Sequence, residues 1–262
     1  MTRFQTPVRE FAHGPLLAVD PSSPIRAVNG LMEERGYSAL PVIDAQGKAV
    51  GVVSRTDMLR IGRAAPRGIG GSWKLLELPE RPVSEIMHEG VISVDGDTKV
   101  ERATHLMVDK RIHRVFVQTD GAITHVFGTK ETMQAVAAER INTPIGEVMS
   151  DKPFTVPTTA TIALATDRLA QARAQGVVVI DPEGWPVGLF TQREALLARD
   201  LPQDGPVEEA MSHGMLCLHV DTPLYRAAAQ GAETRARRVL AIDGRKVVGV
   251  VTGLDFARLC KG

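Results

Sequence analysis

The stretch Pro82-Val83-Ser84-Glu85-Ile86-Met87 is one of four similar openings along a chain of 262 residues. The others are Pro7-Val8-Arg9-Glu10-Phe11-Ala12, Pro144-Ile145-Gly146-Glu147-Val148-Met149 and Pro206-Val207-Glu208-Glu209-Ala210-Met211. Their prolines are 75, 62 and 62 residues apart. Self-similarity at a near-constant spacing is the signature of a repeated structural unit. We therefore expect four copies of one unit, each starting at an opening.

A helix is predicted at a fixed distance from each opening. Its first apolar residue always lies 13 residues beyond the last residue of the opening, at Ile25, Val100, Ile162 or Leu224. Apolar residues then recur at helical spacing and form one buried stripe. The dipeptides Ser23-Pro24 and Thr222-Pro223 predict a Ser or Thr N-cap with proline at the first helical position.

Strands are predicted on both sides of this helix. In the first copy a short apolar run, residues 16–19, precedes the helix. Two β-branched runs follow, Leu40-Pro41-Val42-Ile43 and Val50-Gly51-Val52-Val53, with the turn Asp44-Ala45-Gln46-Gly47 between them. A second helix comes next. The sequence thus predicts an α+β fold in which the order strand, helix, strand, strand, helix occurs four times.

The repeats are expected to pair, because a unit of about 60 residues is too small to bury its sheet alone. We place repeat 1 at residues 1–62, repeat 2 at 82–141, repeat 3 at 142–202 and repeat 4 at 203–262, in two modules, 1–141 and 142–262. The segment 63–81 makes the first period longer. It is glycine-rich but lacks the residue order of a phosphate-binding loop, so we interpret it as an inserted linker.

The composition excludes several classes of protein. With 44% hydrophobic and 24% charged residues the chain is typical of a soluble globular protein. Lys plus Arg (31) equals Asp plus Glu (31), so nucleic acid is not an expected partner. No apolar stretch is long enough to predict a secretion signal or a membrane span. Cys217 and Cys260 lack a paired spacing, which predicts no disulfide and a cytoplasmic location.

Catalysis and metal binding are not predicted. The seven histidines show neither the His-x-x-x-His nor the His-Glu-x-x-His spacing of zinc sites. Gly-x-Ser-x-Gly is absent, and spacing singles out no nucleophile or acid–base pair. We expect a protein that is not an enzyme.

One motif opens the second helix of the repeats. It reads Gly51-Val52-Val53-Ser54-Arg55-Thr56-Asp57 in repeat 1 and Gly249-Val250-Val251-Thr252-Gly253-Leu254-Asp255 in repeat 4. Repeat 3 ends on Glu194, and repeat 2 departs further, with His125-Val126-Phe127-Gly128-Thr129-Lys130-Glu131. One interpretation is a helix-capping box, which suits Glu194 well. The other is a ligand site, because we expect the shorter aspartates to leave a carboxylate that faces a ligand.

A repeat of strand, helix, strand, strand and helix that carries this motif resembles the cystathionine beta-synthase (CBS) domain. The resemblance covers essentially the whole chain. The resemblance implies pseudo-two-fold pairs of repeats with adenosine bound in the shared clefts. It implies that ribose and phosphate are bound by Gly51, Ser54, Asp57, Gly249, Thr252 and Asp255, with a weaker site at Thr191 and Glu194. Ile92 and Ile112 would line the adenine pocket of the Asp57 site, and Phe154 and Gln175 would line that of the Asp255 site.

Basic pairs occur before the second strand in repeats 2 and 4 only, as His113-Arg114 and Arg237-Arg238. The arrangement is similar to the gamma subunit of AMP-activated protein kinase, a resemblance that implies phosphate contacts here. The guanidinium fork suits such contacts. A solvated charged edge is the alternative.

These features predict a stand-alone regulatory protein that binds AMP, ADP or ATP and acts in trans on a separate, unknown protein target. Two chains could pair through the modules into a homodimer. Two alternatives stay open. One is an interaction scaffold with decayed sites, which Gly128 and Glu131 favour, and the other is a site for S-adenosylmethionine or a dinucleotide.

Overall fold

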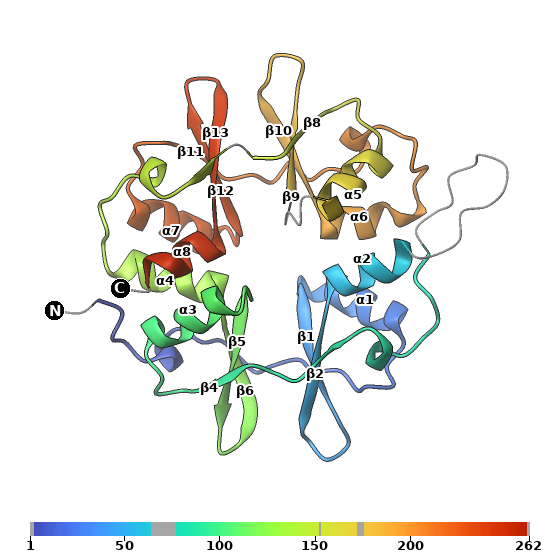
Figure 1. Cartoon of the computed structure of the whole chain (residues 1–262), viewed down its shortest axis with the longest axis vertical. Coiled ribbons are helices and arrows are strands. Elements are labelled where there is room, and N and C mark those ends of the chain that lie inside the picture. Colours follow the sequence, from blue (N-terminus) through green and yellow to red (C-terminus); the bar gives the residue numbers. More distant parts are fainter. Residues whose placement is uncertain (1–2, 64–76, 152, 172–175, 261–262) are drawn as a thin grey trace. The chain divides into compact units, whose positions relative to one another are not determined.

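The computed structural model describes residues 3–63, 77–151, 153–171 and 176–260. The predicted order of elements is confirmed in repeats 2, 3 and 4, and repeat 1 has all of it except a full first strand (Figure 1). Repeat 1 contains α1 (Ile25–Arg35), β1 (Ala39–Ile43), β2 (Ala49–Ser54) and α2 (Arg55–Arg63). Its predicted first strand is reduced to a parallel bridge between Val19 and Val42.

The other repeats have a full first strand. Repeat 2 contains β4 (Ser93–Asp95), α3 (Val100–Asp109), β5 (Arg114–Thr119), β6 (Ala122–Gly128) and α4 (Thr129–Ala138). Repeat 3 contains β8 (Thr155–Pro157), α5 (Ile162–Gln171), β9 (Gly176–Ile180), β10 (Pro186–Thr191) and α6 (Gln192–Leu197). Repeat 4 contains β11 (Cys217–His219), α7 (Leu224–Glu233), β12 (Arg238–Asp243), β13 (Lys246–Thr252) and α8 (Gly253–Leu259). In each, the first strand lies parallel to the second, which forms an antiparallel hairpin with the third.

The four openings fold alike, but each packs on a repeat other than its own. Directly after its proline each forms a short 3-10 helix, at Val8–Glu10, Val83–Glu85, Ile145–Glu147 and Val207–Glu209. The opening of repeat 2 continues into β3 (His88–Glu89), which pairs with β2 of repeat 1. The opening of repeat 3 continues into β7 (Ser150–Asp151), which pairs with β13 of repeat 4.

The exchange of openings is reciprocal. His13, after the first opening, bridges Val126 of repeat 2, and Ser212, after the fourth, bridges Leu189 of repeat 3. The openings of repeats 1 and 2 are therefore exchanged with each other, and so are those of repeats 3 and 4.

The exchange also corrects our prediction for the helix starts. Ser23 and Thr222 do not cap α1 and α7; Pro24 and Pro223 occupy the N-cap positions, in extended backbone and without a side-chain cap. The first amide of each helix instead donates to the carbonyl directly before an exchanged opening, as in Ile25 N to Arg81 O at 2.9 Å. A carbonyl from another repeat thus satisfies a helix-end donor that a local cap would otherwise serve.

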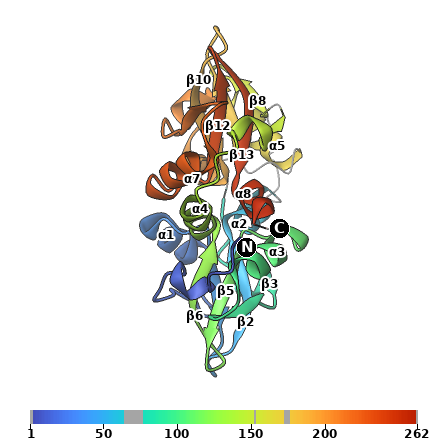
Figure 2. The same cartoon turned by 90° about the vertical axis from the view of Figure 1, so that its left-hand side faces the viewer.

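The described contacts divide the chain into two compact units. The first unit comprises Met1–Leu16, Ile92–Pro153 and Met215–Gly262, and the second comprises Leu17–Val91 and Phe154–Gly214. Each unit has its own hydrophobic core. In the first, α4 of repeat 2 packs against α7 and α8 of repeat 4 (Figure 2). In the second, α2 of repeat 1 packs against α6 of repeat 3.

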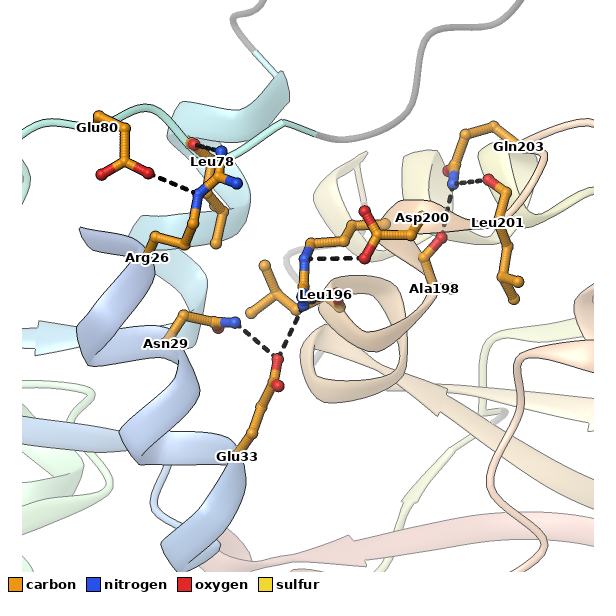
Figure 3. A network of polar contacts seen from close by, with 11 residues as sticks. Arg26, Asn29, Glu33, Leu78, Glu80, Leu196, Ala198, Asp200, Leu201 and Gln203 are labelled. Carbon is orange, nitrogen blue, oxygen red and sulfur yellow. Dashed lines mark hydrogen bonds and ion pairs between the residues drawn. The ribbon is translucent and has the colours of Figure 1, made fainter. Parts of the chain in front are cut away.

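Polar contacts join repeats 1 and 3 in the second unit (Figure 3). The Glu33 carboxylate accepts from Asn29 Nδ2 at 2.6 Å and from Arg199 Nη1 at 3.1 Å. Arg26 donates to the carbonyl of Leu78 at 3.0 Å and pairs with Glu80 at 2.9 Å. The end of the predicted linker is therefore anchored on α1, and residues 64–76 lie outside the described residues.

Candidate functional site

A buried acid stands in the first turn of the second helix in all four repeats. Asp57, Glu131, Glu194 and Asp255 are each at most 5% exposed. Asp57 Oδ2 accepts from the backbone N of Ser54 at 2.9 Å and from its Oγ at 2.6 Å. A buried carboxylate needs such donors, because desolvation without them is costly.

The other acids make the same contact with their own N-cap residues. Asp255 Oδ2 accepts from the backbone N and Oγ1 of Thr252, both at 2.7 Å. Glu194 accepts from Thr191 N at 3.1 Å and from its hydroxyl, and Glu131 accepts from Gly128 N at 2.9 Å. The shorter aspartates therefore complete the capping box as the glutamates do, because the extended N-cap backbone turns its amide toward the first helical turn.

The second oxygen of each acid contacts a basic side chain. Asp57 Oδ1 lies 3.0 Å from His88 Nε2 and 3.4 Å from Arg60 Nη2. Asp255 Oδ1 pairs with Arg258, again three residues further along its helix. Glu194 pairs with Arg193 at 3.1 Å.

Repeat 2 has a histidine in this role. Glu131 Oε1 lies 2.8 Å from His13 Nδ1. None of these partners, Arg60, Arg258, His13 and His88, is among the predicted site residues. The spacing of three residues from the aspartate could have indicated the two arginines, since residues i and i+3 are neighbours on a helix.

The motif glycine faces the exchanged opening. A Cβ on Gly249 would lie 2.3 Å from Met149 Sδ, and one on Gly51 would lie 2.6 Å from the carbonyl of His88. Packing against the opening therefore requires glycine at this position.

Repeat 2 shows the complementary change, since His125 stands where the other repeats have this glycine and Ala12 replaces the methionine of the opening. A Cβ on Gly14, two residues later, would lie 2.7 Å from His125 Cδ2. The departure of repeat 2 from the motif is therefore matched by its exchanged opening.

The four predicted phosphate-binding residues gather in the first unit. Burial lowers the pKa of His113 to about 4, and the positive charges of Arg114, Arg237 and Arg238 add to this effect. Arg114 pairs across its hairpin with Gly128, and Arg238 pairs with Thr252, so both hairpins present the basic pair beside the N-cap of the following helix. Cationic groups from repeats 2 and 4 thus share one electrostatic environment, a ready counter-charge for an anion.

The predicted adenine-pocket residues are distributed between the units. Ile92 and Ile112 pack at the edge of the first core, whereas Asp57, which they were predicted to serve, lies in the second unit. Phe154 is 50% exposed and belongs to the second unit, whereas Asp255 belongs to the first. Gln175 lies outside the described residues. The shared clefts therefore stay a prediction.

Other features give no further site residues. The first unit has two surface pockets. One lies between α4 and α7, and the other lies between the third opening and β13. Neither is lined by a predicted site residue. Among the described residues no group of three metal-ligating side chains converges. None of the helices in the described ranges is both long and apolar enough to cross a lipid bilayer.

The family model of the CBS domain matches residues 8–63, 83–135 and 145–200. These segments make up more than half of the chain, which therefore belongs to the CBS domain family. The fourth repeat, outside these matches, has the same element order.

Three proteins from archaea are similar to this chain in sequence or in structure. Uncharacterized protein MJ1404 of Methanocaldococcus jannaschii is 24% identical over 273 residues, which span 96% of this chain and 61% of that protein. Protein MJ1225 of the same organism, described as a candidate archaeal homologue of gamma-AMPK, superposes with a TM-score of 0.82 at 18% identity, covering 97% of this chain and 99% of that one. An uncharacterized conserved protein from Pyrococcus horikoshii gives 0.67 at 16% identity, covering 97% and 100%. At these identities the structural likeness shows the fold alone.

Proposed function

We propose that this CBS-domain protein is a cytoplasmic regulator that binds an adenine nucleotide and changes its interaction with a separate protein. The observation that carries the proposal is the gathering of His113, Arg114, Arg237 and Arg238 in one unit. These groups come from two repeats, so an anion bound among them contacts both predicted modules. A ligand that prefers one arrangement of the modules would shift the population toward it.

The phosphate is the part of the ligand that the cluster selects. Arginine offers paired donors that match phosphate oxygens, and ion pairs with phosphate are stronger where water is partly excluded than in bulk water. S-adenosylmethionine carries a sulfonium cation, which the same cluster would repel. The cluster therefore favours AMP, ADP or ATP over S-adenosylmethionine.

The ribose is assigned to Asp57 and Asp255, following the family resemblance. Each carboxylate is held by two donors of its own N-cap residue, which fixes its orientation. A ribose diol would bind the outward oxygen, where exposed basic side chains now lie. Glu131 and Glu194 keep the cap and serve as weaker sites.

Isothermal titration with AMP, ATP and S-adenosylmethionine tests the proposal. We expect the two nucleotides to bind and S-adenosylmethionine to bind at least tenfold more weakly, a difference of about 1.4 kcal/mol or more. Replacing both Arg237 and Arg238 by alanine should reduce nucleotide affinity without changing the fold, because the Arg237 side chain is exposed and the Arg238 side chain is half-buried. Arg245→Ala, at an exposed hairpin turn, is the matched control.

An interaction scaffold without ligand is the second candidate, and the capping geometry of all four acids favours it. A ligand selective for the folded state raises apparent stability by mass action. If AMP, ADP and ATP leave the melting temperature unchanged at millimolar concentration, the scaffold replaces the regulator as the better proposal.

A further inference from the structure

Asp57 has no acceptor to spare for a ribose hydroxyl. A carboxylate offers about four lone-pair positions. Ser54 N and Ser54 Oγ take those of Oδ2, at 2.9 and 2.6 Å. Arg60 Nη2 and His88 Nε2 approach Oδ1, at 3.4 and 3.0 Å. A ligand that uses this carboxylate has to displace one of the four donors.

His88 and Arg60 are the donors that can leave. The side chain of His88 is 70% exposed and that of Arg60 is 64% exposed, against 2% for Asp57. Either side chain can turn into water at small cost, because exposed ion pairs contribute little to stability. Ser54 is different, since its release would unmake the cap of α2.

The Asp255 site provides an internal comparison. Its acid has the same cap, and Arg258 stands where Arg60 does. The exchanged opening differs: His88 pairs with Val52 in the ladder, whereas Ser150 pairs with the equivalent Val250. The histidine is thus the one additional donor at the Asp57 site among the contacts described.

Repeats 2 and 3 repeat this contrast. His13 bridges Val126 and contacts Glu131, whereas Ser212 bridges Leu189 beside Glu194. The first two repeats therefore have a histidine at this position of the exchanged opening, and the last two have a serine.

We propose that His88 is a gate residue of the Asp57 site: it occupies the acceptor that a ribose hydroxyl needs, and nucleotide binds there after His88 has turned away. His13 plays the same part at Glu131. The inference rests on the proposed function, and it makes the Asp57 site weaker than the Asp255 site when the histidine is charged.

The sign of the pH effect follows from the groups around His88. Asp57 and Arg60 face it from α2, Glu89 follows it on β3, and the facing residues of β2, Gly51 and Val52, do not titrate. A protonated imidazole is held by the Asp57 carboxylate more strongly than a neutral one. Protonation of His88 should therefore close the gate.

His113 would act in the opposite direction. Its protonation would favour an anionic ligand, but its pKa of about 4 leaves it neutral above pH 6. A fall in affinity between about pH 8 and pH 6 therefore does not come from His113.

The test exchanges the residues of the two sites: serine replaces His88 at the Asp57 site, and histidine replaces Ser150 at the Asp255 site. AMP is titrated calorimetrically into the full chain carrying Asp255→Asn, with and without His88→Ser, at about pH 8 and about pH 6. We expect His88→Ser to raise the affinity about two- to fivefold at the lower pH and less at the higher one. In the Asp57→Asn protein, Ser150→His should lower the affinity of the remaining site and make it pH-dependent. His213→Ala, at an exposed histidine that follows the fourth opening, should change neither value.

Unchanged or lower affinity in the His88→Ser protein, while AMP still binds, would overturn the gate and leave the proposed function standing. Absence of AMP binding in the wild-type chain and in every variant would overturn both. The phosphate of AMP also titrates near pH 6, which changes the affinity of any site for AMP. The Asp255 site binds the same ligand, so its pH dependence gives the part that comes from the phosphate.

Discussion

At the scale of single residues, one carboxylate makes two kinds of contact. Asp57 and Asp255 complete helix caps, yet each turns its second oxygen toward exposed cations. Capping and ligand binding are therefore compatible interpretations of one motif. A variant such as Asp255→Ala would lose the cap together with the proposed ligand contact, so any loss of ligand binding has to be compared with stability in the absence of ligand.

His113 makes stability depend on pH. Its pKa is about 4 in the folded chain because of burial and three neighbouring arginines, whereas an unfolded histidine has a pKa near 6.5. Between these values the unfolded chain binds the additional proton, so the free energy of unfolding should fall as the pH falls from about 6.5 to about 4. We expect His113→Gln to flatten this part of the profile by up to about 3 kcal/mol, measured by urea unfolding. A profile identical to that of the wild type would contradict the assignment; His213→Gln is the control.

At the scale of elements, the packing of the exchanged openings determines which residue fits at the glycine position of the motif. The glycine of the motif and the methionine of the opening fit each other in repeats 1, 3 and 4, and a histidine fits alanine in repeat 2. Because the motif residue and the opening residue belong to different repeats, a substitution in one repeat changes the packing of the opening of another.

Gly249→Ala tests this fit. The added Cβ would lie 2.3 Å from Met149 Sδ and 3.0 Å from the carbonyl of Ser150. Overpacking of this kind costs about 1–3 kcal/mol. Thermal or urea unfolding of Gly249→Ala, Met149→Ala and the double variant should give a favourable coupling energy, since shortening Met149 removes the nearer clash. Strictly additive effects would show that the two residues do not share the space.

At the scale of the molecule, each compact unit combines repeats from both predicted modules. In the first unit α4 buries Met133 and Val136 in a core that α7 and α8 of repeat 4 complete. A fragment of residues 1–141 keeps the exchange between repeats 1 and 2 but loses these helices. Its α4 face would then expose apolar side chains.

We therefore expect the 1–141 fragment to associate with itself, because exposed apolar helix faces drive association in water. Sedimentation velocity at increasing concentration should show a dimer, and Met133→Glu should return it to a monomer. A folded fragment that stays monomeric at high concentration would contradict this view of the helix faces.

Local patterns were enough to predict the four repeats, their element order and the basic pairs of repeats 2 and 4, because strands, helices and turns follow from residues close together in the chain. The capping acids were also visible, as one of two interpretations. The N-caps predicted from the Ser-Pro and Thr-Pro dipeptides were wrong, because the helix amides donate to carbonyls that are distant in the sequence.

Only the tertiary structure decided the exchange of openings, the contact of His88 and His13 with buried acids, and the sharing of cores by repeats 1 and 3 and by repeats 2 and 4. These contacts join residues that no short-range spacing relates. They depend on which surfaces of nearly identical repeats meet, and the pattern within one repeat carries no information about its neighbour.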